Sequence, residues 1–189
     1  MDQTLITAEE ITNHRPELIK QENSFVLPEW QLFVLGVATG GLYFFYWFFS
    51  NWKHFKIHKD LDISPGWRTV GLFIPIYGLM LVYRQLQAIR KYAAEAGIEP
   101  TFYSGAVLMV YIVICGLGRL PDPYWLISTL FFVPFHPVQR TLNAYWRQQQ
   151  PGLAVRNGLS IYQVIVILLG CIGWGFILLG MNYGLKVRS

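Results

Sequence analysis

The sequence predicts an all-α, polytopic transmembrane helix bundle, and its composition, sparse charge and long uncharged stretches all favour that class. Of the 189 residues, 53% are hydrophobic and 16% are aromatic, and the mean hydropathy is +0.35. Only 14% are charged, whereas soluble domains carry about 25%. A disordered chain, a coiled coil or an ordinary soluble enzyme would have a different composition.

Three long stretches of the chain contain no charged residue. A helix needs about 20 mostly apolar residues to cross a hydrocarbon core of about 30 Å. Within that core the backbone groups must bond inside their own segment, which favours helices. We therefore predict membrane spans at residues 31–49, 102–117 and 161–181.

Two shorter hydrophobic segments, 69–83 and 123–139, contain internal prolines. Pro75 lies in the first, and Pro134 and Pro137 lie in the second. Because proline removes a helical hydrogen bond, both segments are predicted to be broken. They fit short kinked spans, re-entrant hairpins or interfacial helices, and spans are favoured. The chain then has four or five hydrophobic segments, two of them broken by proline.

The distribution of Lys and Arg bears on how many segments cross, because cytoplasmic loops carry an excess of both. If segment 123–139 crosses and 69–83 does not, ten basic residues lie inside and five outside. If all five segments cross, the numbers are seven and eight. The four-crossing arrangement is therefore preferred.

The chain is predicted to have an acidic mobile tail at residues 1–27 and an integral membrane domain at 28–189. The first 30 residues contain six acids and only two basic residues, which is the wrong charge for a cleavable signal peptide. Thr7 and Glu10 have the spacing of a capping box, so one short helix is expected in the tail.

An internal repeat of residues 28–97 and 100–152, followed by the last span at 161–181, is one interpretation of the membrane domain. Segment 84–91 resembles 140–147 position by position. Chance similarity between apolar sequences is the other interpretation, and both stay open. In a true repeat the two proline-broken segments would either both cross the membrane or both stay out of it. The distribution of Lys and Arg instead favours an arrangement in which only one of them crosses. An inverted repeat would make that pair of segments a natural transport site.

The end of the first predicted span is rich in aromatic and basic residues. One helix over 31–59 would be about 43 Å long and would emerge from the bilayer. Its tryptophans would then lie at headgroup depth and its lysines would reach lipid phosphates. An anchoring belt is the favoured interpretation, and a site for an anionic lipid headgroup is the alternative. The candidate lipid or partner interface is Trp47, Trp52, Lys53, Lys56, Lys59, Trp67 and Arg68.

Other polar and small residues suggest sites less strongly. His54 and His58 have helical spacing that can hold a transition metal, but a polar interfacial face is favoured. The pairs Gly36/Gly40 and Gly180/Gly184 allow close helix packing, or docking of a partner. A polar motif that would line a transport cavity consists of Arg84, Gln139, Arg140 and Asn143.

Catalytic and ion-transport signals are absent from the sequence. The predicted spans 31–49, 102–117 and 161–181 contain no charged residue, which argues against an ion-coupled transporter or pump. There is no glycine-rich phosphate loop, no Gly-x-Ser-x-Gly and no His-Glu-x-x-His. We therefore predict no catalytic residues, no metal and no cofactor.

Three motifs together resemble a family of bacterial integral membrane proteins with no established activity. Its members combine a Tyr-x-x-Tyr-Trp helix end, present here within residues 41–53, with an Ile-x-Pro-x-Trp-Arg loop, present as Ile63 to Arg68. The third motif is Pro137-Val-Gln-Arg140, followed by Asn143. The resemblance covers residues 28–183 and departs at Gly66, where relatives tend to have an aromatic residue. It implies a multi-pass protein of the bacterial inner membrane.

The leading functional prediction is a non-enzymatic accessory, structural or assembly subunit of a membrane complex. Its partners would be membrane lipids and other membrane subunits or a second copy of itself, and not nucleic acid. The alternative is a small transporter, channel or lipid-handling protein that uses the proline-broken segments. A third possibility is an enzyme with an unrecognised interfacial site.

Overall fold

The fold is helical throughout the part of the chain that the computed structural model describes, residues 24–155 and 157–188, with side chains to Met181. The predicted tail helix at Thr7 and Glu10 lies outside these residues. The elements are α2 (Glu29–Ala38), α3 (Tyr43–Lys59), α4 (Pro65–Val70), η1 (Gly71–Phe73), α5 (Pro75–Glu95), α6 (Ser104–Gly116), η2 (Leu117–Arg119), η3 (Tyr124–Leu130), η4 (Val133–Phe135), α7 (His136–Gln149) and α8 (Ile161–Arg188).

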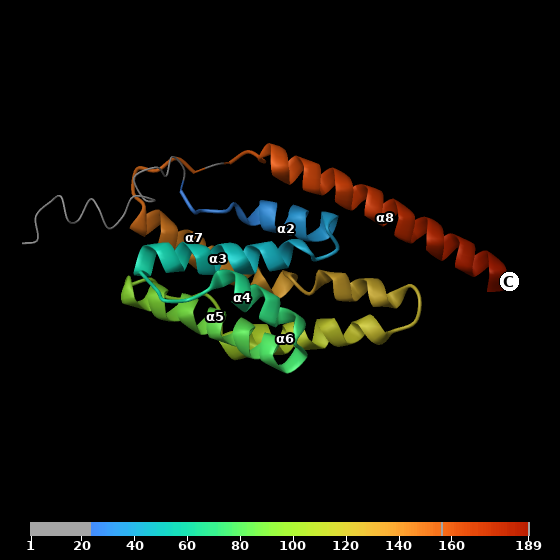
Figure 1. Cartoon of the computed structure of the whole chain (residues 1–189), viewed down its shortest axis with the longest axis horizontal. Helices are drawn as coiled ribbons and strands as arrows, with labels where there is room; N and C mark the ends of the chain where they lie inside the picture. Colours follow the sequence, from blue (N-terminus) through green and yellow to red (C-terminus); the bar gives the residue numbers. More distant parts are fainter. Residues whose placement is uncertain (1–23, 156, 189) are drawn as a thin grey trace, which may run out of the picture.

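The prediction of one continuous span over 31–49 is wrong, because the chain turns back between α2 and α3 (Figure 1). The turn depends on Gly40 and Gly41, whose φ angles are 57° and 89°. Only glycine adopts such angles without a steric penalty. The amide of Tyr43 donates to Oγ1 of Thr39 at 2.9 Å and so fixes the start of α3. Ten residues give α2 a length of only about 15 Å.

α3 buries its aromatic face inside the bundle. Phe44, Phe48 and Phe55 are core residues that pack toward η4, α5 and α7. Trp47 and Trp52 are 2% and 4% exposed, so the prediction that their side chains face lipid headgroups is wrong. The error follows from the straight helix over 31–59, since folding the chain at Gly40 and Gly41 turns this face inward.

The second predicted span and segment 123–139 form the two arms of one hairpin. α6 and η2 run outward, and η3 and η4 return along them to α7 (Figure 1). Gly118, on the outward arm, lies beside Ser128 on the returning arm. The predicted span 102–117 therefore corresponds closely to α6, but segment 123–139 is not a single helix.

The prolines begin helices and do not kink them. Pro75 is in the first turn of α5 and Pro137 is in the first turn of α7, where the missing amide hydrogen has no helical partner to lose. Segment 69–83 is therefore divided among α4, η1 and α5, and the expected kinked span does not form. α5 and α7 pack against each other, but α3 has no counterpart in the second unit of the suggested repeat.

α8 is the one element among the described residues that is long and apolar enough to cross a membrane. Its segment Ile161–Met181 has a mean hydropathy of 2.6 and is not buried against the rest of the protein. Ser160 and Gln163 form a capping box, with bonds of 2.7 and 3.1 Å, that starts the helix. Twenty-one residues give about 31 Å, so the predicted span 161–181 is confirmed in length and composition.

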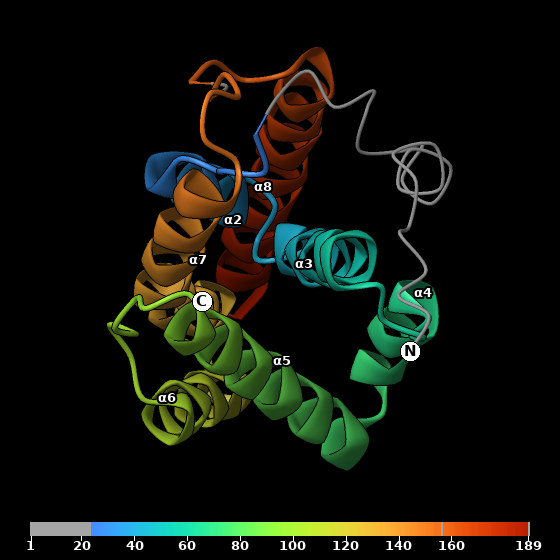
Figure 2. The ribbon, with the colours of Figure 1, turned by 90° about the vertical axis from the view of Figure 1, so that its left-hand side faces the viewer.

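The helices form three layers. α2 and α8 form one outer layer, α3 and α7 the middle, and α5 and α6 the other outer layer (Figures 1 and 2). Exposed large apolar side chains lie mainly on α2, the start of α5, α6, η3 and α8. Nine of the ten Lys and Arg residues between 24 and 155 lie on α3, α4, α5 and α7, and the tenth is Arg119, close to the hairpin tip.

Candidate functional site: a cavity between α2, α3 and α8

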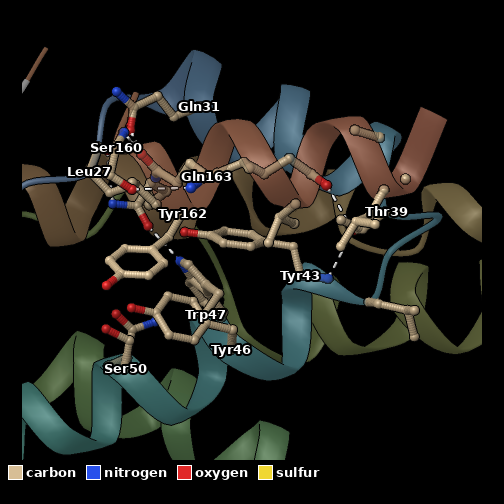
Figure 3. Close-up of a pocket in the computed structure, with 18 of the residues that line it drawn as sticks. Leu27, Gln31, Thr39, Tyr43, Tyr46, Trp47, Ser50, Ser160, Tyr162 and Gln163 are labelled. Atoms are coloured by element: carbon tan, nitrogen blue, oxygen red, sulfur yellow. Dashed lines mark hydrogen bonds between the residues drawn. The ribbon is translucent and has the colours of Figure 1, made fainter. Parts of the chain in front are cut away.

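A cavity of about 1040 Å³ lies between α2, α3 and α8 (Figure 3). Residues 24–27 line part of it, and α7 contributes Gln139 and Trp146. Sites for small molecules are commonly about 300–1,000 Å³, so this cavity has room for a large ligand. The chain makes it because α8 packs mainly on α2 and leaves part of the polar face of α3 uncovered.

Polar groups gather toward one end of the cavity. Figure 3 shows Tyr46, Ser50 and Tyr162 at the end away from Thr39, with the phenol of Tyr43 across the middle. Ser50 Oγ and His54 Nε2 are hydrogen-bonded at 3.3 Å. This end therefore presents hydroxyl, amide and imidazole groups, all of them able to bond to an uncharged ligand.

One buried polar group at the cavity has no partner in the described residues. Asn51 lines the cavity and is 6% exposed, and its Nδ2 makes no hydrogen bond there. Buried amide groups nearly always have a hydrogen-bond partner. Asn51 thus lines the cavity with part of its side chain, while its Nδ2 is enclosed by the protein.

α8 supplies a largely apolar wall. Val166, Leu169, Gly173 and Ile177 line it at helical spacing. Among the described residues that line the cavity there is no Lys, Arg, Asp or Glu. An acyl chain or another apolar group could lie along this wall.

α8 is attached to α2 near both ends of this wall. Near the start, Gln31 Nε2 donates to the carbonyl of Asn157 at 3.1 Å. Further along, Trp174 Nε1 donates to the carbonyl of Val37 at 2.8 Å. Between them Gly170 lies so close to the carbonyl of Ala38 that any side chain there would collide with it. The cavity wall is therefore fixed along α2.

His54 is held in its neutral form at the polar end. Its ring stacks on Phe25, with centroids 3.8 Å apart and planes 11° from parallel, and lies edge-on to Trp146. Burial, with a smaller effect of the neighbouring Lys53 charge, lowers the pKa of His54 to about 4. At neutral pH this imidazole is an uncharged hydrogen-bonding group.

The predicted lipid or partner interface is only partly on the surface. Lys53 and Lys56 are exposed on α3, and Trp67 is 75% exposed on α4. Lys59 is half-buried, 3.8 Å from Glu95. Three of the predicted members, Lys53, Lys56 and Trp67, are therefore on the surface of the described fold.

The other members of that interface are structural. Arg68 is only partly exposed, and its guanidinium lies 4.1 Å from the centre of the Trp52 ring, which it covers. Trp47 donates to Gln139 inside the bundle. Both tryptophans therefore serve the packing of α3, and an anchoring role for them is wrong.

The predicted polar motif is divided into a buried pair and an exposed pair. Gln139 Nε2 donates to Asn143 Oδ1 at 2.8 Å, and both side chains bond the backbone of Leu27. Arg84 and Arg140 are exposed and do not join them. Of the four, only Gln139 reaches the cavity, so the cavity expected from this motif is not formed.

The same bonds correct the prediction of a mobile tail at residues 1–27 for its last residues. Leu27 is bonded to Asn143, and the amide of Phe25 donates to Gln150 Oε1 at 2.9 Å. Val26 is a core residue. Residues 24–27 therefore belong to the bundle, and residues 1–23 lie outside the described part.

The remaining small and polar candidates have packing roles where they are described. His58 lies edge-on to Trp146, and His136 is 2.9 Å from Glu29. No group of three or more His, Cys, Asp or Glu able to hold a metal was found among the described residues. Gly36 lies against the ring of Phe132, which is a packing contact. The side chains of residues 182–189, and so part of the second glycine pair, are outside the description.

Sequence analysis named His54, Trp47 and Gln139 for other roles and missed most of the residues that line the cavity. Ser50, Asn51 and His54 share a helix face with Trp47, and a polar stripe inside an aromatic run was the available signal. Tyr162 and Gly173 gave no comparable signal, because their role depends on how α8 packs. Comparisons with protein-family models, curated proteins and solved structures find no match for this chain.

Proposed function

We propose that this protein is an integral membrane protein that binds an amphiphilic lipid in the cavity between α2, α3 and α8. The cavity itself is the observation that carries the proposal: it has an apolar wall on α8 and uncharged polar groups at one end. This division matches a molecule with an apolar chain and a polar head. The role is one of binding, and it corresponds to the lipid-handling alternative of the sequence analysis.

The proposed membrane arrangement combines one full span with helical hairpins. α8 crosses the bilayer. The outward arm, α6 with η2, is about 26 Å long, and Arg119 near its tip would reach the opposite headgroups. The shorter α2 and α3 pair enters part of the way. The basic ends of α3, α5 and α7 would face the cytoplasm under the positive-inside rule.

The proposed arrangement is still multi-pass, as the sequence predicts, but the segments that cross the membrane are paired differently. Segments 102–117 and 123–139 cross as the arms of one hairpin, and residues 31–49 fold back within the membrane. The motif resemblance supports the bacterial inner membrane as the location. In this setting α8 borders the cavity on the lipid side, so a lipid can enter between α8 and α3 without passing through water.

A cavity-filling substitution tests the proposal. Gly173 lines the cavity and a side chain there meets open space, so Gly173→Leu should occupy the lipid volume without disturbing the fold. Gly175 is also open on α8 but does not line the cavity, so Gly175→Leu is the matched control. The native chain should retain one lipid in native mass spectrometry after mild extraction. Gly173→Leu should reduce that occupancy at least tenfold, and Gly175→Leu should not.

Two results would contradict the proposal. One is a native chain that carries no lipid beyond the random detergent and bilayer background. The other is equal lipid occupancy in Gly173→Leu and the native chain. Both variants should keep the native thermal transition, which separates loss of binding from loss of folding.

An accessory or assembly subunit is a second candidate, favoured by the outer surface of α8. Leu168, Ile172 and Phe176 are exposed there, and the segment Ile161–Met181 is not buried in the chain. Such a surface fits either lipid or another membrane helix. Sizing of the same mild extract decides this candidate: a stoichiometric protein partner supports it, and a lipid-bearing chain or homo-oligomer contradicts it.

A further inference from the structure

Large apolar side chains are exposed where α4, η1 and the start of α5 meet, a surface that we call the α4–α5 corner. Its exposed members are Trp67, Val70, Phe73, Ile74, Ile76 and Met80. None of these six is among the described residues that line the cavity. A cluster of this kind marks a surface that contacts a partner or a membrane, whereas single exposed apolar residues carry no such meaning.

The apolar part of the corner has a length that fits one leaflet of a bilayer. The first charged residue of α5 is Arg84, eight residues after Ile76, which is about 12 Å along a helix. Half of a hydrocarbon core is about 15 Å. Along the long axis of Figure 1, α4 lies at about the level at which α8 begins, and α8 is the helix proposed to cross. With the start of α5 in the leaflet, Arg84 therefore lies near the headgroups.

The geometry of the corner places Arg84 close to Arg68. The ring of Tyr77 lies against Gly71, directly after α4, so this face of α5 is turned toward α4. Arg84 follows Tyr77 by seven residues, or about two helical turns, and so shares that face. Burial, and after it the charge of Arg84, lowers the pKa of the Arg68 guanidinium, which agrees with this placement. Two cations therefore face each other at the edge of the apolar surface.

Neither of these guanidinium groups has an anionic partner among the described residues, where the ion pairs involve other cations. Arg68 is held over the ring of Trp52, 4.1 Å from its centre, and this contact fixes its position. Neither Arg68 nor Arg84 donates a side-chain hydrogen bond to a described residue, so their N–H groups are available to an outside acceptor. A phosphate satisfies two neighbouring guanidinium groups, because its oxygens accept several charge-assisted hydrogen bonds.

We propose that the α4–α5 corner enters the cytoplasmic leaflet and that Arg68 and Arg84 together bind the phosphate of an anionic phospholipid. The apolar residues of the corner contact the acyl chains, which favours a lipid over free phosphate. This site shares the membrane location of the proposed function, but it is separate from the cavity and does not depend on what the cavity binds.

Binding of defined phospholipids to the full chain tests the site. The protein in mild detergent is titrated with phosphatidylglycerol or phosphatidylcholine that carry the same acyl chains, and native mass spectrometry reports the occupancy. A basic residue near an anionic lipid surface contributes about fivefold in affinity. We therefore expect phosphatidylglycerol to bind at least about fivefold more tightly than phosphatidylcholine, whose choline would add a cation beside two arginines. Equal affinities would overturn the proposal.

Arg84→Gln is the more direct of the two possible variants, because Arg84 is exposed and has no bonded partner among the described residues. It should lower the affinity for phosphatidylglycerol about fivefold and leave the thermal transition unchanged. Arg147→Gln is the charge-matched control, since Arg147 is exposed on α7 and outside the corner. Its affinity should match that of the native chain. Equal losses in both variants would mean a general attraction of charge and would rule out a site at the corner.

Inorganic phosphate distinguishes a lipid site from a general anion site. In excess, it should displace no more phosphatidylglycerol than sodium chloride of the same ionic strength, because it lacks acyl chains. Stronger displacement by phosphate would contradict the assignment to a lipid.

Gly173→Leu separates this site from the proposed cavity function, because Gly173 lines the cavity. The variant should keep the native preference for phosphatidylglycerol, whether or not it loses the lipid retained on extraction. A preference that disappears in Gly173→Leu would place the anionic headgroup in the cavity and overturn the site at the corner.

Discussion

The indole nitrogen of Trp47, on α3, donates a 2.6 Å hydrogen bond to Oε1 of Gln139, on α7. Both side chains are 2% exposed. The amide nitrogen of Gln139 in turn donates to Asn143 Oδ1 at 2.8 Å and to the carbonyl of Leu27 at 3.2 Å. One glutamine thus joins α3, α7 and the segment before α2, and these three border the polar side of the cavity.

Gln139→Leu should destabilise the bundle. Leucine removes the acceptor of Trp47 and leaves a buried N–H group unpaired, which costs about 1–3 kcal/mol. Gln87 is the matched control, because its amide bonds to Tyr83 on an exposed face, so Gln87→Leu should stay within about 0.5 kcal/mol. Unfolding in detergent micelles followed by circular dichroism measures both. Equal stabilities of the two variants would show that the buried network contributes little.

Gly41→Ala should disrupt the turn between α2 and α3. Gly41 has φ of 89°, and an added Cβ would collide with the ring of Phe131. Gly97 also has positive φ, 74°, but an added Cβ there meets open space. Gly97→Ala should therefore cost about 1–2 kcal/mol for its backbone alone. Gly41→Ala should cost about 1–3 kcal/mol more, because the ring must move.

The same unfolding experiment compares the two glycine variants. If both lose the same stability, the contact between the turn and the returning arm of the hairpin is unimportant. If Gly41→Ala loses more, the turn is packed against that arm in the folded protein.

His54 should make the stability of the protein depend on pH. Burial, and to a smaller extent Lys53, lowers its pKa from 6.5 to about 4 in the folded state, so the unfolded state binds more protons between these values. The stability associated with neutral His54 is therefore complete above about pH 6.5 and is lost as the pH falls toward 4. By linkage the loss approaches about 3 kcal/mol.

Unfolding of the native chain and of His54→Gln at pH 7.5, 6, 5 and 4.5 measures this effect. The variant lacks the titrating group, so the difference between the two stability curves should shrink as the pH falls. Parallel curves across this range would show that another group causes the acid sensitivity.

The extent of the last span followed directly from the sequence, whereas the first span did not. Ile161–Met181 is an uninterrupted apolar stretch within the single helix α8, so no turn divides it. Residues 31–49 are equally free of charge but contain the adjacent glycines Gly40 and Gly41, which let two short helices fold back on each other. Charge spacing measures the length of an apolar segment and does not reveal a turn inside it.

The cavity depended on tertiary structure in a way that sequence patterns could not show. Trp47 and Trp52 were assigned to a membrane surface because a straight helix would expose them. The turn before α3 folds the chain back, so that both side chains point into the bundle. Asn51 lies between them in the sequence and lines the cavity only because α8 packs on α2 and leaves this part of α3 open. The packing of α8 depends in turn on the lack of a side chain at Gly170.

The proposed membrane arrangement predicts which side of the bilayer each end of the fold reaches. Cys115 and Cys171 are both exposed and replaceable by serine, which gives a background for single new cysteines. Gln87, on the basic part of α5, should face the cytoplasm, and Leu120, at the hairpin tip, should face the other side. A membrane-impermeant maleimide added to intact spheroplasts should label Leu120→Cys and should label Gln87→Cys only after lysis.

The alternatives give different labelling patterns because each leaves the tip in a different environment. A tip that stops inside the hydrocarbon would protect Leu120→Cys from both sides, which would make the hairpin re-entrant and leave α8 as the crossing element of the described fold. Labelling of Gln87→Cys in intact spheroplasts would reverse the orientation and contradict the charge argument. The native Arg119 and Asp122 beside the tip favour the crossing arrangement, since both charges would lose their water at mid-membrane.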